Sequence, residues 1–397
     1  MQRIEKKVKI AQLQTGVFMT LRYLTAGESH GPALTGIVEG MPAGVKLCRQ
    51  DFDILLRRRR AGYGRGARVK IEADRVEVLA GVVGGLTIGS PIALLIRNDD
   101  FAAHSAYMNP FEASSDAGRL KVPLPGHADL PGIQKYGFND CRPIRERASA
   151  RETAMRTALS VPPRKMLQLL NVGSTCFVES IGGIQAAVDY EADPAAIALA
   201  VVENGDEFLT PDAGVIDKWR ELIDTASENR FSLGGSGAVI FSGLPVGLGS
   251  HVHFDRRLDS ILAGLVMSIP AVRGVEIGCA VKAAASRSAC GDAIFYSRQG
   301  GFTRGSNLAA GLEGGMTNGQ PLIIRFHMKP LPGNSGLESV NLDTLAAEQP
   351  PHYRSDIQAV AAAAVAVESV VAIQLASEIL AATGGNNIDE VAARLHR

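Results

Sequence analysis

Residues 356–381 read DIQAVAAAAVAVESVVAIQLASEILA, and this stretch decides the fold. Alanine and aliphatic side chains occupy nearly every position, which favours one long helix that is apolar on almost all faces. Ser355 or Asp356 is expected to cap the start of this helix, and Gly384-Gly385 to end it. A helix of this kind is buried on several sides, so we expect layers such as sheets to enclose it.

Two further helices are expected before it in the chain. Residues 143–159 begin with proline and place Ile144, Met155 and Leu159 on one face. Arg151 shares that buried face, and a buried cation is costly unless an anion or a buried carboxylate accompanies it. Residues 256–269 form the other helix, which Asp255 is expected to cap.

Shorter segments complete an α+β pattern. We expect a helix over 51–60, stopped by glycine, and a hairpin over 69–81. Residues 98–126 are polar and predict a long loop. Strands are expected over 21–25, 37–41, 91–96, 238–241, 275–277 and 321–329. Because no linker composition interrupts the chain, we expect one domain over 19–397, preceded by a disordered extension over 1–18.

The overall charge and hydropathy exclude some classes of binding partner. The 397 residues contain 41 Lys+Arg and 41 Asp+Glu, so no net charge attracts nucleic acid or anionic lipid. The longest uninterrupted apolar run covers 359–367, far short of the roughly 20 residues of a membrane span. Five scattered cysteines without a CxxC spacing favour a reducing compartment. We therefore expect a cytoplasmic protein without a membrane or nucleic-acid partner, in which local clusters bind any anions.

One such cluster is RRRRAGYGRGAR, residues 57–68. It interleaves six arginines with three glycines, and guanidinium groups bind phosphate and carboxylate well. The spacing matches neither a dinucleotide-binding nor a P-loop motif. A small phosphorylated ligand is the first interpretation. An arginine-rich helix end is the second, and a nucleic-acid stripe is the third.

Two histidines lie in glycine-rich loops. His30 stands in GESHG after the first expected strand, and His127 in PGHADLPG beside Asp129. Both settings suit proton transfer, although most loop histidines are not catalytic. Asp356 is either a helix cap or a functional carboxylate. His251 and His253 give a weak metal hint without a third ligand, so no metal site is expected.

The order of the motifs resembles the chorismate synthase family. The resemblance is carried, over about residues 21–382, by LTAGESHGPALTGIVEGMPAG, RRRAGYGRGAR, GSPIALLIRN, PGHADLPGIQKYGFND, RERASARETAMR, LPVGLGS, MSIPAVRGVEIG, GLEGGMTNGQPL and RSD. It implies a β-α-β sandwich with helices packed between sheets, assembled as a homotetramer. It also implies a lyase that converts 5-enolpyruvylshikimate 3-phosphate to chorismate by anti-1,4-elimination of phosphate. Reduced FMN is required without net redox change, and NADPH is a possible reductant.

The resemblance also implies roles for particular residues. His30 is implied to protonate the departing phosphate, His127 to stabilise the reduced flavin, and Asp356 to help the flavin accept the substrate proton. The implied ligand-binding positions, which contact the flavin or the substrate anion, are Arg59, Arg65, Arg147, Ala148, Ser149, Pro270, Ala271, Gly314, Lys329, Pro330, Leu331, Pro332, Gly333 and Arg354.

The chain departs from the family pattern at four places. Leu124, Ala310, KPLPG at 329–333 and AVKAAASRSACGDAIFY at 280–296 stand where the family has other residues. These departures leave a second interpretation open, in which a divergent member binds flavin or phosphate ligands with little turnover.

Overall fold

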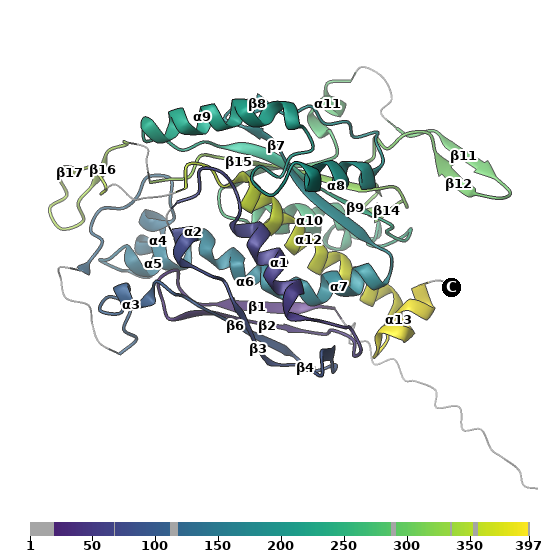
Figure 1. Ribbon diagram of the computed structural model, residues 1–397, viewed down its shortest axis with the longest axis horizontal. Coiled ribbons are helices and arrows are strands. Elements are labelled where there is room, and N and C mark those ends of the chain that lie inside the picture. The colour runs from purple at the N-terminus through teal and green to yellow at the C-terminus, as the bar shows by residue number, and fades with distance from the viewer. Residues whose placement is uncertain are drawn as a thin grey trace, which may run out of the picture.

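The structure is a computed structural model, described here for residues 20–66, 68–111, 118–286, 291–333, 336–351 and 356–395. Two antiparallel sheets enclose a layer of helices, as Figure 1 shows. The first sheet has the order β1-β2-β6-β3, with β1 Arg22–Ala26, β2 Ala33–Glu39, β6 Ile92–Arg97 and β3 Val76–Ala80. The second has the order β10-β15-β9-β7-β8, with β10 Val272–Ile277, β15 Leu322–Met328, β9 Gly235–Ser242, β7 Gly173–Ile181 and β8 Ile184–Gln185.

The remaining elements are helices and short hairpin strands. The helices are α1 Arg49–Arg60, α2 Arg68–Ile71, α3 Phe101–His104, α4 Asp129–Tyr136, α5 Arg142–Arg147, α6 Thr153–Leu159, α7 Val161–Leu169, α8 Pro194–Glu203, α9 Ile216–Glu228, α10 Leu258–Met267, α11 Ala280–Ala284, α12 Val360–Thr383 and α13 Ile388–Leu395. The short strands are β4 Val82–Val83, β5 Leu86–Thr87, β11 Ile294–Ser297, β12 Gly301–Arg304, β13 Leu312–Glu313, β14 Met316–Thr317, β16 Ser339–Val340 and β17 Ala347–Glu348.

Helix α12 forms the centre of the molecule. It packs directly on β7 and β9 of the second sheet and on α1, α6, α7 and α10, which share the middle layer. By length and composition it could cross a membrane, but 94% of its most apolar window is buried inside the fold. The expected enclosed helix is confirmed, and so is the α+β class with helices between sheets.

Helix α6 joins this middle layer to the first sheet. The strand β2 alternates between buried and exposed side chains, so its inner face holds Leu34, Gly36 and Val38. A Cβ atom on Gly36 would lie 2.7 Å from side-chain atoms of Met155 and Leu159. The missing side chain therefore lets α6 lie close against the sheet.

Several sequence-based boundaries are wrong. The helix expected over 143–159 is two helices, α5 and α6, separated by an extended Ser149 and a 3-10 turn over Ala150–Glu152. The hairpin expected over 69–81 is α2 followed by β3, because β3 pairs with β6. Helix α10 begins at Leu258, since Arg257 is extended, so Asp255 does not cap it.

The start of α12 also differs from the prediction. The helix begins at Val360, whose N–H donates to Oε1 of Gln358 at 2.8 Å. The Asp356 carboxylate is instead engaged by Arg65 and by the Gly66 backbone, so it caps nothing. Ser355 lies outside the described residues. The expected end of the helix at Gly384 is confirmed by its positive φ of 61°.

The buried cation Arg151 has the partners that its position requires. It forms ion pairs with Glu72 and Asp74, both buried, and its Nε donates to Asn98 at 3.0 Å. The choice left open by the sequence is therefore settled in favour of buried carboxylates. This network ties α6 and the preceding turn to the α2–β3 segment.

Candidate active site

His30 lies in the turn between β1 and β2 and is held by Glu146 of α5. The Glu146 carboxylate accepts the His30 backbone N–H at 2.8 Å and contacts Nδ1 at 2.9 and 3.0 Å. Burial alone would raise the pKa of Glu146, but the hydrogen bonds and charge of His30, together with Arg142, place that pKa below its ordinary value. An ionised Glu146 therefore fixes the ring and leaves Nε2 facing away from α5.

His127 is held in the same way by Asp129. Its Nδ1 lies 2.7 Å from Oδ1 of Asp129, a fully buried carboxylate that also pairs with Arg145 of α5. Burial acts to raise the pKa of Asp129, and hydrogen bonds from His127, Arg145 and the Leu124 backbone outweigh it, so the net pKa is lowered. Asp129 thus links one imidazole to one arginine.

Helix α5 carries residues that help to hold each of the two histidines. Arg145 and Glu146 are consecutive residues of α5. Glu146 contacts His30 directly, and Arg145 donates to Asp129, which contacts His127. This helix is fixed by α4, where a Cβ on Gly132 would lie 2.4 Å from Cγ2 of Ile144. The close approach of α4 and α5 explains the second glycine of PGHADLPG.

Arg147 follows as the last residue of α5 and is exposed. Its Nη2 donates to the backbone oxygen and to Oγ1 of Thr25, each at 3.1 Å. Thr25 in turn donates to Glu152, which pairs with Arg156, and Arg156 donates to Ser268 at 2.7 Å. This polar path connects Arg147 to the segment that carries Pro270 and Ala271.

Helix α5 is followed by a break in the helical backbone at Ser149. The backbone of Ser149 is extended, and its hydroxyl accepts the Arg151 N–H at 3.3 Å. Arg59 supports this turn from α1 by donating to the Ala150 oxygen and to Oγ1 of Thr153. Arg59 is 6% exposed, and burial lowers its pKa to about 10. The hydrogen bonds of the buried Arg59 guanidinium therefore hold the turn from its buried side.

Asp356 and Arg65 form a pair beside Arg59. Nη1 of Arg65 lies 3.0 Å from Oδ2 of Asp356, and the Gly66 N–H donates to Oδ1 at 2.6 Å. The neighbouring Arg354, one of the expected flavin contacts, lies outside the described residues.

The segment from Lys329 to Gly333 lies against the loop of His127. Nζ of Lys329 donates to the Gly126 oxygen at 2.6 Å, and its backbone N–H donates to the Ala271 oxygen at 3.0 Å. Ala271 has a positive φ of 70°, which is unusual for a residue with a side chain. Pro330, Leu331 and Pro332 continue from Lys329, and Ser232 donates to the Leu331 oxygen. The structure thus brings 126–127, 270–271 and 329–333 together.

Gly314, which was expected to contact the flavin, takes no part in the interactions described above. It lies at the turn between β13 and β14, next to Gly315, whose open side faces Arg257. The hydrogen bonds and ion pairs found among the described residues do not connect this turn to α5.

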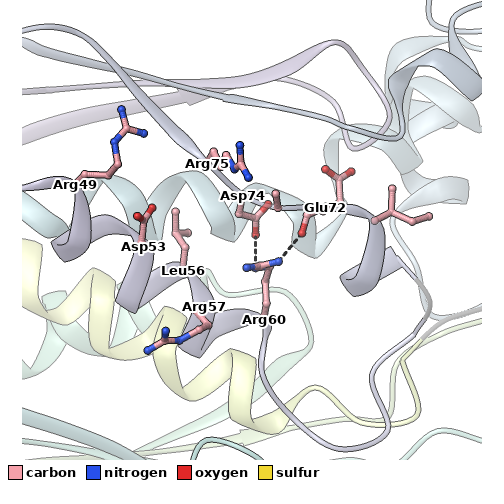
Figure 2. A pocket seen from close by; sticks show the side chains of 10 residues that line it. Arg49, Asp53, Leu56, Arg57, Arg60, Glu72, Asp74 and Arg75 are labelled. Carbon is pink, nitrogen blue, oxygen red and sulfur yellow. Dashed lines mark hydrogen bonds and ion pairs between the residues drawn. The ribbon is translucent and has the colours of Figure 1, made fainter.

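The rest of the arginine-rich cluster faces elsewhere. A cavity of about 600 Å³ is lined by Arg49, Asp53, Leu56, Arg57, Arg60, Ile71, Glu72, Ala73, Asp74 and Arg75. Figure 2 shows the side chains around it. Arg60 points towards Asp74 and Glu72, whereas Arg57 points away from them. Neither histidine lines this cavity, and Arg60 contacts the Asp74 carboxylate at 3.9 Å and the Glu72 backbone oxygen at 2.6 Å. We therefore centre the candidate site on α5, where the chemistry converges.

Sequence reasoning missed the residues that hold the histidines. Glu146 stands inside the RERAS motif between two arginines, and no role was predicted for it. Its contact with His30 spans 116 positions, so only the fold reveals it. Asp100 and His104 lie in the segment 98–126, which was expected to be a long functional or mobile loop, but neither residue was singled out in it.

Known proteins resemble this chain throughout its length. A sequence model of the chorismate synthase family matches residues 21–380. The chorismate synthase of Desulforamulus reducens is 47% identical over 382 residues, covering 95% of this chain and 98% of its own. That of Chloroherpeton thalassium is 45% identical over 388 residues, covering 94% and 98%. A crystal structure of chorismate synthase superposes with a TM-score of 0.76 at 37% identity, covering 95% of this chain and 96% of its own. The chain belongs to the chorismate synthase family, a family of lyases.

Proposed function

We propose that this chain eliminates phosphate from 5-enolpyruvylshikimate 3-phosphate to give chorismate, with reduced FMN bound beside the substrate. The observation that carries the proposal is the pair of imidazoles at α5, each oriented at Nδ1 by a buried carboxylate. Two oriented imidazoles beside the exposed Arg147 suit a reaction that moves protons around a phosphate ester.

The residues at the site suit a flavin phosphate and an anionic substrate. Arg147 supplies an exposed cation and Lys329 a half-buried one. Nε of Arg65 is buried without a hydrogen-bond acceptor among the described residues, which favours an anion or a ligand oxygen nearby. When bound, the reduced flavin supplies an electron-rich ring that assists the elimination without net oxidation or reduction.

The protein's own groups then have distinct tasks. We propose that His30 donates a proton from Nε2 to the departing phosphate oxygen while Glu146 holds Nδ1. His127, held by Asp129, is proposed to stabilise negative charge on the flavin, and Asp356, held by Arg65, to assist removal of the substrate proton. Arg147 and Lys329 are proposed to bind the anionic groups and to offset charge on the leaving phosphate.

The experiment that tests the function is substrate conversion under anaerobic conditions. The enzyme, the enolpyruvyl ester and chemically reduced FMN should yield chorismate and one equivalent of inorganic phosphate. Oxidised FMN should yield neither product. Binding of FMN without conversion would reject this activity and would favour the divergent, ligand-binding alternative. Substituting NADPH for the chemical reductant tests whether the chain reduces its own flavin.

We further propose a homotetramer in the cytoplasm, formed from residues 19–397 as one catalytic domain. The support is the family membership, the zero net charge and the burial of α12 inside the fold. Light scattering on the purified protein would test the assembly.

Arg147→Ala is expected to weaken FMN binding by about tenfold or more. A charge-assisted hydrogen bond contributes about 1.5–3 kcal/mol, and the exposed Arg147 side chain is well placed to make one. Fluorescence titration of FMN measures the dissociation constant. Arg22→Ala is a suitable control, because Arg22 is 73% exposed on β1 and pairs loosely with Glu39 at 3.7 Å. An unchanged dissociation constant for Arg147→Ala would count against this cofactor site.

A further inference from the structure

Two side chains that the proposed reaction does not use lie beside His30. Asp100 precedes the short helix α3, and His104 is its last residue. Oδ2 of Asp100 lies 3.4 Å from Nε2 of His104 and 4.0 Å from Nε2 of His30. The two imidazole rings face each other with centroids 4.2 Å apart. One ligand atom from each of the three residues lies within 4.8 Å of the other two.

This geometry suits a divalent transition metal. Two imidazole nitrogens and one carboxylate oxygen are ligands that zinc takes at about 2.0–2.2 Å. Two donors on one tetrahedral ion of this kind are therefore about 3.3–3.6 Å apart. The Asp100–His104 distance of 3.4 Å falls in this range, whereas the Asp100–His30 distance of 4.0 Å requires these two side chains to move closer together. The histidine nitrogens lie within 4.8 Å of each other, so side-chain rotation has to bring them closer to hold one ion. The three side chains are 21–29% exposed, so an ion can reach them and keep open positions for water.

Glu146 completes the arrangement from behind His30. Histidine ligands of metals commonly donate their other ring N–H to a carboxylate, which fixes the tautomer and directs the remaining lone pair at the ion. Glu146 contacts Nδ1 of His30 at 2.9 Å, so the lone pair of Nε2 faces the side of Asp100 and His104. Glu146 thus sets the orientation of the His30 ring before any ion arrives.

We propose that His30, Asp100 and His104 bind one divalent ion of the zinc class, and that this ion inhibits the enzyme reversibly. Binding requires only the three side chains. Inhibition rests on the proposed function of His30, because an ion on Nε2 removes the atom that would donate the proton. Softer, imidazole-seeking ions should bind, whereas Mg²⁺ and Ca²⁺, which prefer oxygen ligands, should not.

Cobalt substitution tests the binding without flavin or substrate. Co²⁺ added to the purified full chain should produce visible absorption of a protein-bound ion at one equivalent per chain, and Zn²⁺ should remove that absorption by competition. His104→Gln and Asp100→Asn should each weaken Co²⁺ binding by about tenfold or more, because each deletes a ligand. Circular dichroism checks that each variant is folded, and if one unfolds the other decides.

A second histidine pair supplies the matched control. His251 and His253 are exposed, and His253 already pairs with Asp255 at 2.6 Å. The double variant His251→Gln, His253→Gln should therefore leave Co²⁺ binding unchanged. Full binding in both His104→Gln and Asp100→Asn, or loss of binding only in the control, would overturn the proposed site.

An activity measurement then tests the inhibition separately. Zn²⁺ should lower the wild-type rate with a midpoint equal to its dissociation constant, and a chelator should restore the rate. Binding without inhibition would overturn the inhibitory role while keeping the metal site. Absence of activity in metal-free enzyme would instead reject the proposed function and leave the cobalt result standing.

Discussion

His30→Ala is expected to lower the kcat for phosphate elimination by about 10²–10⁴-fold, the usual cost of losing a positioned acid or base. The side chain is 28% exposed, and its partner Glu146 keeps hydrogen bonds to the chain because it also accepts the His30 backbone N–H. The fold should therefore survive the change. The rate of chorismate formation with reduced FMN, measured anaerobically at saturating substrate, gives kcat directly.

The control for this experiment is His253→Ala. His253 also pairs with a carboxylate through Nδ1, but it lies exposed and away from α5. Its replacement should leave kcat within about twofold of the wild-type value. His127→Ala should resemble His30→Ala, since Asp129 orients His127 in the same manner. Near-wild-type turnover in either site variant would remove that histidine from the mechanism.

Glu368→Ala is expected to lower the free energy of unfolding by about 3–5 kcal/mol. Glu368 is fully buried on α12, and its Oε2 lies 3.0 Å from Nη1 of Arg164, whose side chain is 15% exposed. Burial opposes ionisation of Glu368, but the charges of Arg164 and Arg58 leave its pKa below the ordinary value. Removing the carboxylate would strand those cations in a nearly water-free layer. Urea unfolding at pH 7 measures the effect.

The effect should depend on pH in a defined direction. Because the pKa of Glu368 is lower in the folded state, its contribution is fully present above the ordinary glutamate pKa, about 4.3. The contribution is lost as the pH falls through the folded-state pKa, so wild type and variant should converge in acid.

An exposed pair gives the matched comparison. Glu207 and Arg220 also lie 3.0 Å apart, but their side chains are 46% and 37% exposed. Glu207→Ala should cost about 0–1 kcal/mol, as surface ion pairs do. If Glu368→Ala cost no more than Glu207→Ala, burial of this pair would not govern its energetics.

The sequence predicts the central layer better than its connections. Alanine and aliphatic residues alone indicate that α12 is enclosed, because no polar face remains to meet water. Strand β2 was predicted less well: a strand was expected over 37–41, whereas β2 covers Ala33–Glu39. The break between α5 and α6 was missed, because a regular apolar spacing continues across Ser149 and hides its extended backbone. The stabilising contacts there come from Arg59, 90 residues earlier, which local patterns cannot show.

In the candidate site, too, the sequence predicts some residues and misses others. His30 and His127 are visible as histidines among glycines, and family motifs mark the loops around them. The carboxylate partners of the two histidines are not equally easy to predict from the sequence. Asp129 is two residues from His127, whereas Glu146 approaches His30 only through the fold. His104 gave no signal, because its significance depends on the ring of His30 lying 4.2 Å away.

The order of the chain has a consequence for synthesis. Every strand described in both sheets precedes α12 in the chain, yet the inner faces of those sheets close over α12 and its neighbours. Translation proceeds from the N-terminus, so the ribosome releases the strands of both sheets before it releases α12. The apolar inner faces of the sheets therefore stay uncovered by α12 for the time needed to add residues 360–383. This time is about 1–5 s at 5–20 residues per second.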